Sequence, residues 1–276
     1  MSDFLELVKT RRSVRTFDGQ KLDQTTVDDL KNYAKEIVNP YNIPIKFVFL
    51  DADEYNLSSP VLAGEKLYVS AAVKAGEHAE EAYGYSFEKL LMHAHEMGLG
   101  TVWIGGTMPR EKFEDATGLL ENEVMPCVSP LGKAAKKMSI KETLMRKGVK
   151  ADVRFDFKDL FFRNDFQTPF TKGTAMEEGL ADALEAIRLA PSAVNKQPWR
   201  VVVGDHVAHF YEKHDKGYIT PKYDLQKIDI GIAMYHFEKE LQEEGRDPKC
   251  EVNDPGIAMP ADTDYVASYR WQAALK

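Results

Sequence analysis

The stretch LADALEAIRLAPSAVNKQPWRVVVGD, residues 180–205, changes its pattern twice. Its first part, LADALEAI (180–187), carries apolar residues at helical spacing, and its last part, WRVVVGD (199–205), is an apolar run typical of a buried strand. Between them Pro191 and Pro198 fix the backbone at both ends of a polar loop. The stretch therefore predicts a helix, a rigid loop and a strand, in that order.

The order of these elements occurs twice in the chain. In both halves we predict a helix, two strands, a long helix that ends at a glycine, and a further strand. An internal duplication with drifted sequence is the simplest interpretation, and chance repetition of a common α+β order is the alternative. The corresponding segments are 30–37 and 180–187, 46–52 and 199–205, 67–73 and 207–213, 77–97 and 228–244, and 101–104 and 249–252.

The complete pattern predicts an α+β fold in which mixed, mostly antiparallel sheets are flanked by helices. We expect two intertwined halves, residues 1–150 and 151–276, with a polar, lysine-rich connector at 133–160. The other expected elements are helices near 3–12 and 25–38 and strands at 45–50, 66–73, 101–106 and 124–132.

Composition excludes several classes of protein. With 276 residues, 43% of them hydrophobic, the chain can bury one large core or two modest ones. No apolar run approaches the ~18 residues of a membrane span, and the net charge of −8 argues against a general nucleic-acid binder. The first residues lack a signal-peptide pattern, and two cysteines form no disulfide framework. We therefore expect a cytoplasmic protein that acts on small molecules.

A basic motif, RRSVR (11–15), stands out in this acidic chain. Arginines at a helix end, with a serine between them, can hold a phosphate dianion through forked, charge-assisted hydrogen bonds. The three arginines cannot all point the same way, so we expect one of them to be structural. A solvated basic patch is the alternative interpretation. The candidate phosphate ligands are Arg11, Arg12, Ser13 and Arg15.

The loop PSAVNKQPW (191–199) suits a flat heterocycle. Ser192, Asn195 and Gln197 offer donors and acceptors from a preset backbone, and amide side chains satisfy both kinds of group. An ordinary proline-bounded turn is the alternative. The first half has no such loop, and the second half keeps one arginine in LFFRNDFQTPF (160–170), where the first has RRSVR. Because each half holds what the other lacks, we predict one composite site assembled from both.

Three motifs together resemble the nitroreductase family of flavoproteins: RRSVRTF near the N-terminus, MGLGTVWIGG after a long helix, and APSAVNKQPW before a strand. Members of that family are typically intertwined homodimers with FMN bound between subunits. An ordinary member carries the first and third motifs close together, whereas about 180 residues separate them here. The resemblance therefore implies a branch in which a single chain imitates the dimer. We expect a monomer that acts as a pseudo-dimer, and further homo-oligomerisation stays open.

The resemblance also implies roles for individual residues. The basic motif would hold the ribityl phosphate of FMN, the Pro-Ser motif would approach the isoalloxazine ring, and the glycine-rich backbone would reach N5. Family members carry a Gly-Tyr-Pro segment and then a basic residue near the phosphate. LGKAAKK (131–137) lacks Tyr and Pro, so Lys136 or Lys137 is the weaker match. The implied cofactor-binding residues are Arg11, Arg12, Ser13, Arg15, Ile104, Gly105, Gly106, Lys137, Pro191, Ser192, Asn195 and Gln197.

The implied function is that of an FMN-dependent NAD(P)H oxidoreductase. By resemblance, NADH or NADPH would reduce the flavin by hydride transfer, and a nitroaromatic or quinone-type acceptor would then oxidise it in a ping-pong cycle. The alternatives are a non-enzymatic flavin-binding or redox-sensing protein, and a relative with divergent chemistry such as reductive dehalogenation. No catalytic side chain is demanded. No metal site is expected, because His93 and His95 lie on different faces of a predicted helix.

Overall fold

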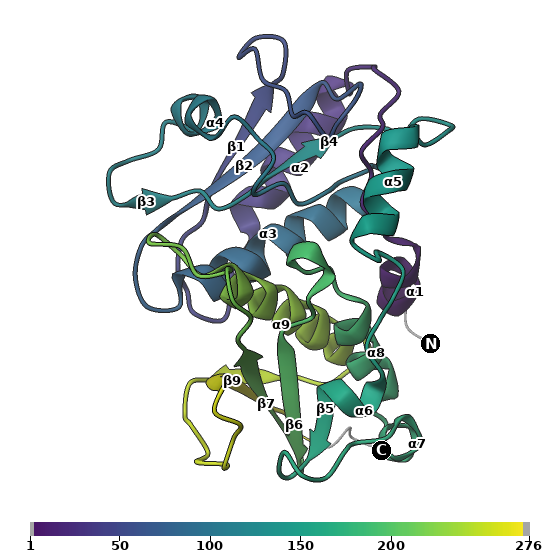
Figure 1. Cartoon of the computed structure of the whole chain (residues 1–276), viewed down its shortest axis with the longest axis vertical. Coiled ribbons are helices and arrows are strands. Elements are labelled where there is room, and N and C mark those ends of the chain that lie inside the picture. Colours follow the sequence, from purple (N-terminus) through teal and green to yellow (C-terminus); the bar gives the residue numbers. More distant parts are fainter. Residues whose placement is uncertain (1–2, 273–276) are drawn as a thin grey trace. The chain divides into compact units, whose positions relative to one another are not determined.

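The structure of the protein, a computed structural model, describes residues 3–272 (Figure 1). These residues divide into two compact units. The first unit contains residues 10–152 and 221–223, and the second contains residues 3–9, 153–220 and 224–272. The N-terminal helix α1 (Asp3–Thr10) therefore begins in the unit formed mainly by the later residues. There Phe4 packs edge-on against the rings of Tyr235 and His236.

The first unit is built around an antiparallel sheet in which β2 is central. Strand β1 pairs with one edge of β2, and β3 and β4 pair in succession with the other edge. The strands are β1 (Lys46–Asp51), β2 (Leu67–Lys74), β3 (Glu123–Val124) and β4 (Val128–Leu131), and the helices are α2 (Gln24–Glu36), α3 (Ala79–Glu96), α4 (Arg110–Thr117) and α5 (Ile140–Gly148).

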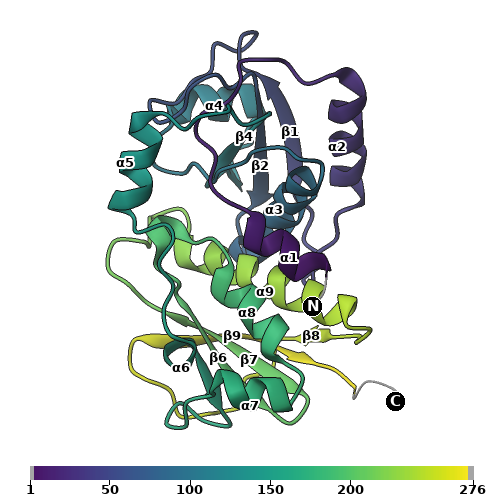
Figure 2. The same cartoon turned by 90° about the vertical axis from the view of Figure 1, so that its right-hand side faces the viewer.

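Helices cover both faces of this sheet (Figure 2). Phe47 of β1 packs against Phe87 of α3, with ring centroids 6.2 Å apart. Tyr68 of β2 packs against Phe113 of α4, with ring centroids 4.9 Å apart. Phe47 faces Ala71 across the sheet, three residues from Tyr68, so the two contacts lie on opposite faces. The buried rings and the alternating strand residues thus form two cores, one on each side of the sheet.

The second unit contains a five-stranded sheet in the order β5-β6-β7-β9-β8. All neighbouring strands are antiparallel except β5 and β6. Phe210 of β7 packs against Phe237 of the long helix α9 (ring centroids 5.5 Å apart), and α8 packs on α9. The strands are β5 (Phe161–Arg163), β6 (Trp199–Gly204), β7 (Val207–Lys213), β8 (Lys249–Glu251) and β9 (Thr263–Arg270), and the remaining helices are α6 (Phe157–Leu160), α7 (Lys172–Glu177), α8 (Ala181–Leu189), the 3₁₀ turn η1 (Ala193–Asn195) and α9 (Leu225–Glu243).

The two units share one topology. In each, the first two corresponding strands, β1 and β2 or β6 and β7, are antiparallel, and the second pairs with a closing strand, β4 or β9. The segment after the long helix then pairs antiparallel with the closing strand. In the first unit Ile104 pairs with Val128, and in the second β8 pairs with β9. The predicted α+β fold with mostly antiparallel sheets is confirmed, and the repeated strand order supports the internal duplication.

Three predicted elements were wrong in detail. Residues 101–106 form no regular strand: only isolated residue pairs occur there, because glycines at 100, 105 and 106 weaken a strand. The predicted strand 124–132 is divided into β3 and β4 at Pro126, which has no N–H to donate. The predicted connector 133–160 contains α5, whose start has the Ser-x-x-Glu pattern of a capping box: Ser139 Oγ accepts the Glu142 N–H at 3.1 Å.

Within residues 3–272, no helix is long and apolar enough to cross a membrane.

Candidate functional site

The basic motif lies between two other motifs of the first unit. The Val14 N–H donates to the carbonyl of Thr101 at 2.9 Å, which joins RRSVR to the glycine-rich stretch. On the other side, the Ala135 N–H donates to the carbonyl of Thr16 at 2.9 Å, which joins it to LGKAAKK. A Cβ on Gly100 would lie 2.8 Å from the Cβ of Val14, so glycine is required for this approach. The fold therefore brings three separate motifs together.

Arg12 is held by the protein itself. Its Nη1 donates to Oε1 of Glu142 at 2.8 Å, and Thr16 Oγ1 donates to Oε2 of the same carboxylate at 2.7 Å. Glu142 is only 1% exposed, so its charge needs these partners. This ion pair attaches α5 to the basic motif and makes Arg12 a structural residue.

Arg11 and Arg15 differ from Arg12, because they keep polar atoms without a partner. Nε of Arg11 and both Nε and Nη1 of Arg15 are buried and make no hydrogen bond with any described residue. Burial lowers the pKa of both guanidinium groups, and the nearby charge of Arg146 lowers it as well. A carboxylate partly offsets this at each residue: Glu88 at Arg11 and Glu142 at Arg15. Guanidinium groups remain charged in proteins, so these donors favour an anion.

Arg146 of α5 adds a third cation to Arg11 and Arg15. Its Nη2 donates to Asp152 at 2.5 Å, and its charge acts on both motif arginines. The sequence interpretation missed Arg146, because residues 133–160 were assigned to a connector; the Ser-x-x-Glu pattern was the signal that could have found the helix. Buried, unpaired donors beside a further cation fit a phosphate dianion, which accepts several charge-assisted hydrogen bonds. Lys136 and Lys137 lie nearby in the chain and are exposed.

The glycine pair after TVWI leaves two backbone donors available. The amide of Ile104 already donates to the carbonyl of Val128 at 2.9 Å, and its side chain is buried in the core. The amides of Gly105 and Gly106 have no acceptor in the described part of the chain. Arg110 fixes this turn by donating to the carbonyl of Gly105 at 2.8 Å. Of the three predicted positions at the flavin N5 edge, only the two glycines therefore have a backbone donor to offer.

The Pro-Ser loop of the second unit uses its polar groups internally. Gln197 accepts from the Phe155 N–H at 3.0 Å, and its own N–H donates to Ser192 Oγ at 2.9 Å. The side chain of Asn195 donates to the carbonyl of Val153 at 2.8 Å and accepts from Arg154 at 3.2 Å. These bonds are those of the proline-bounded turn considered as the alternative. Ring binding by Ser192, Asn195 and Gln197 stays a prediction, as does that by Pro191.

Several residues of the same loop have positive φ angles, and one buried carboxylate binds the loop by a hydrogen bond. Val194, Asn195 and Gln197 have positive φ values of 50°, 58° and 51°. Such a conformation is unfavourable for a β-branched residue, and Val194 is also 60% exposed. The buried Asp229 of α9 accepts the Ala193 N–H at 3.0 Å. Burial raises the pKa of Asp229 well above its ordinary value. Strain at an exposed valine is typical of loops that contact ligands.

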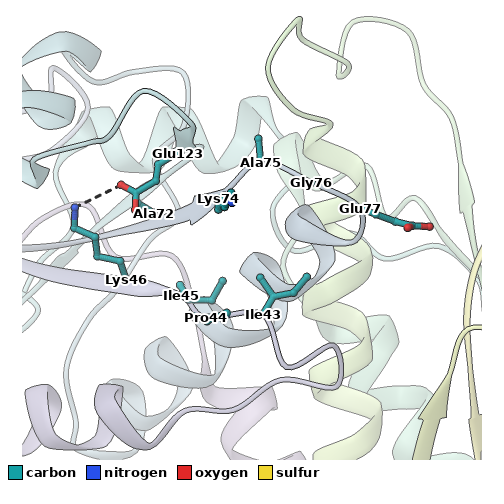
Figure 3. Close-up of a pocket in the computed structure, with 10 residues that line it drawn as sticks. All are labelled: Ile43, Pro44, Ile45, Lys46, Ala72, Lys74, Ala75, Gly76, Glu77 and Glu123. Atoms are coloured by element: carbon teal, nitrogen blue, oxygen red, sulfur yellow. Dashed lines mark ion pairs between the residues drawn. The ribbon is translucent and has the colours of Figure 1, made fainter.

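A separate pocket lies at one end of the first unit's sheet (Figure 3). It has a volume of about 480 Å³, and none of the predicted site residues lines it. Its Lys46 pairs with Glu123 at 3.5 Å and donates to the carbonyl of Gly118 at 2.7 Å. Lys46 is therefore already paired, and Lys74, the other lysine that lines the pocket, is exposed, unlike the buried guanidinium nitrogens of the basic motif. It is lined by Ile43, Pro44, Ile45, Lys46, Ala72, Lys74, Ala75, Gly76, Glu77 and Glu123.

A model of the family described as "Putative TM nitroreductase" matches residues 3–240, most of the chain. The protein therefore belongs to this nitroreductase family. Its structure is similar to that of a putative nitroreductase from Thermotoga maritima, with a TM-score of 0.61 and 18% identity. The match covers 98% of this chain and 93% of the other. At this identity, the similarity shows a common fold over the full length.

Weaker structural matches cover about half of the chain. A nitroreductase family protein from Clostridium novyi is 20% identical over 49% of this chain and 86% of its own, with a TM-score of 0.42. An FMN-dependent nitroreductase from Clostridium difficile is 17% identical over 54% of this chain and 96% of its own, with a TM-score of 0.41. A comparison with curated proteins found no match.

Proposed function

We propose that the protein is an FMN-dependent NAD(P)H oxidoreductase that reduces nitroaromatic or quinone-type acceptors. The observation that carries this proposal is the set of buried, unpaired guanidinium atoms on Arg11 and Arg15, beside Arg146. A surface patch would be solvated, whereas these donors are shielded from water and need an anion. Membership of the nitroreductase family supports a flavin phosphate as that anion.

Each residue has a distinct task in this proposal. Arg15 and Arg11 neutralise the phosphate, and Arg12 holds α5 in place through Glu142 so that Arg146 stays near them. The amides of Gly105 and Gly106 are donors for the ring edge around N5. When bound, FMN supplies the redox chemistry, accepting electrons from NADH or NADPH and passing them to the acceptor. The protein therefore needs no acid or base of its own.

The distribution of the motifs also suggests how many flavins the chain binds. The basic motif and the glycine pair belong to the first unit, and the Pro-Ser loop belongs to the second. Each unit has one of the two motifs that an ordinary member of the family combines in one subunit. We therefore propose a single FMN per chain.

The first experiment identifies the cofactor and tests the role of Arg15. Purified protein should be yellow and should release material with the mass of FMN. Arg15→Ala should weaken FMN binding about 10- to 100-fold, or ~1.4–3 kcal/mol, in a fluorescence titration, because a charge-assisted contact is lost. With saturating FMN, turnover of NADH or NADPH with menadione should largely recover, because the phosphate contact is the same in ground and transition states.

The matched control is Lys31→Ala, which removes an exposed positive charge from α2 of the same unit. It should leave FMN affinity unchanged. Release of FAD, or equal FMN affinities of the parent and Arg15→Ala, would contradict the proposal that Arg15 binds the FMN phosphate. A protein that binds FMN but does not turn over with either nicotinamide would instead be a flavin-binding or redox-sensing protein.

A further inference from the structure

Three ligand-type side chains of the second unit meet where β7 ends and α9 begins. Glu212 is the second-last residue of strand β7, His214 follows two residues later, and Asp224 is the N-cap residue of α9. One ligand atom from each lies within 4.8 Å of the other two. The chain between His214 and Asp224 forms a loop, so the cluster joins both ends of that loop to the sheet.

The state of Glu212 is the main evidence for a site, because its carboxylate is buried and makes no hydrogen bond. The residue is 0% exposed, and neither carboxylate oxygen has a hydrogen-bond partner. A buried carboxylate in this state is costly, since burial removes water without replacing its hydrogen bonds. The structure therefore contains an anion that needs a proton or a cation.

His214 directs a ring nitrogen toward this carboxylate. Its Nε2 lies 2.8 Å from Oδ2 of Asp264, which fixes the orientation of the ring. Its Nδ1 is 3.1 Å from Oε1 of Glu212, yet the two atoms form no hydrogen bond. If Nε2 carries the proton and donates it to Asp264, then Nδ1 presents a lone pair to a carboxylate oxygen. A cation bound by both atoms would remove the repulsion between the lone pair and the carboxylate oxygen.

We propose that Glu212, His214 and Asp224 bind a divalent transition-metal ion of the Zn²⁺ type. An imidazole nitrogen with carboxylate oxygens is a donor set that Zn²⁺ and its neighbours accept, whereas Mg²⁺ and Ca²⁺ prefer oxygen alone. Metal–ligand bonds of about 2.0–2.2 Å are compatible with ligand atoms 3.1 Å apart. Asp264 is the outer carboxylate that often orients a metal-bound histidine.

The arrangement of carboxylates around His214 also favours a cation. Glu212 and Asp224 lie on one side of its ring, and Asp264 lies 2.8 Å from its Nε2. Three carboxylates thus repel one another around one histidine. A metal ion would offset this repulsion and hold the loop between residues 214 and 224 at both ends, so its role would be structural.

The experiment uses the full chain after chelator treatment and dialysis. Titration calorimetry with ZnCl₂ should give one ion per chain and should raise the melting temperature. Glu212→Gln should weaken Zn²⁺ binding by more than about 100-fold. Asp264→Asn should weaken it by about 10- to 100-fold, the usual effect of losing an orienting carboxylate. MgCl₂ should not compete at equal concentration. Circular dichroism should show that the metal-free variants are folded.

Glu244→Gln is the matched control, because Glu244 belongs to a second acidic group with Asp182 and Glu240 in the same unit. This variant should bind Zn²⁺ like the parent. Co²⁺ provides an independent measurement: its visible absorption should report a nitrogen ligand and should change in His214→Gln. No Zn²⁺ binding by the parent, or equal binding by Glu212→Gln, would overturn the proposal and leave a shared proton on the carboxylates. The outcome does not depend on FMN.

Discussion

At the scale of single residues, the partner of each charge decides its role. Arg12 and Arg15 are three residues apart in the same motif, yet only Arg12 has a carboxylate partner, Glu142. Arg15 retains two buried nitrogens without a partner and is therefore the better candidate for an anion. Residue type alone predicted neither role, because both side chains are arginines in one basic motif.

Glu244 gives a prediction on pH at this scale. Burial, together with the charges of Glu240 and Asp182 and against the effect of Arg246, raises the pKa of Glu244 from 4.5 to about 7. The folded protein therefore holds a proton that the unfolded chain releases between pH 4.5 and 7, so this group's stabilising contribution falls as the pH rises through that window. Urea unfolding at pH 5 and pH 8 should show a smaller loss of stability in Glu244→Gln than in the parent. Identical pH dependence in both would contradict the assignment.

At the scale of elements, α5 connects stability to the candidate site. Ser139 caps its start, Glu142 in its first turn holds Arg12 and Thr16, and Arg146 in its last turn acts on the motif arginines. The helix is short, and much of its surface is polar, so its position depends on these contacts more than on an apolar face. Loss of the N-cap should therefore also disturb the positions of Arg12 and Arg146.

Ser139→Ala tests this element. It removes the oxygen that accepts the Glu142 N–H, and we expect a loss of about 1 kcal/mol, within the usual range of 0.5–2 kcal/mol, in urea unfolding. FMN affinity should also fall, because α5 carries Arg146. Thr25→Ala, at an exposed position of α2 in the same unit, is the control and should change neither quantity. If the Ser139→Ala protein is destabilised but its FMN affinity is unchanged, α5 does not contribute to FMN binding.

At the scale of the whole molecule, the duplication allows the two units to specialise. Both have the same strand order, but only the first has the arginines and the glycine pair, and only the second has the Pro-Ser loop. A dimer of identical subunits would carry every motif twice. In one chain each copy can lose a motif that the other retains.

Coupling between the units follows from this specialisation. Arg15→Ala and Asn195→Ala should each weaken binding of the same FMN, and the double variant should deviate from the sum of the two losses. The measurement is FMN affinity in a double-mutant cycle, together with the FMN content per chain, which should be one. Strictly additive losses, or two flavins per chain, would mean that each unit has its own site.

Local patterns in the sequence predicted much of the fold and part of the site. The apolar periodicity found α2, α3, α8, α9 and the main strands, because these elements bury residues at regular intervals. It missed α4 and β9, and it assigned α5 to a connector. The basic motif, the glycine pair and the Pro-Ser loop were recognisable because their residue types are unusual at such spacing. The cluster of Glu212, His214 and Asp224 was not, because its members come from two segments without a motif.

The sequence by itself determined the family, the α+β class and the duplication, because periodicity and motifs are properties of neighbouring residues. Only the tertiary structure decided which polar groups are already satisfied. It paired Arg12 with Glu142, 130 residues away, and bound the side chains of Asn195 and Gln197 to residues 153–155. It also left Arg11, Arg15 and Glu212 with buried atoms that lack a partner. Hydrogen bonding and burial depend on groups that meet only in the folded chain, so no local pattern could assign them.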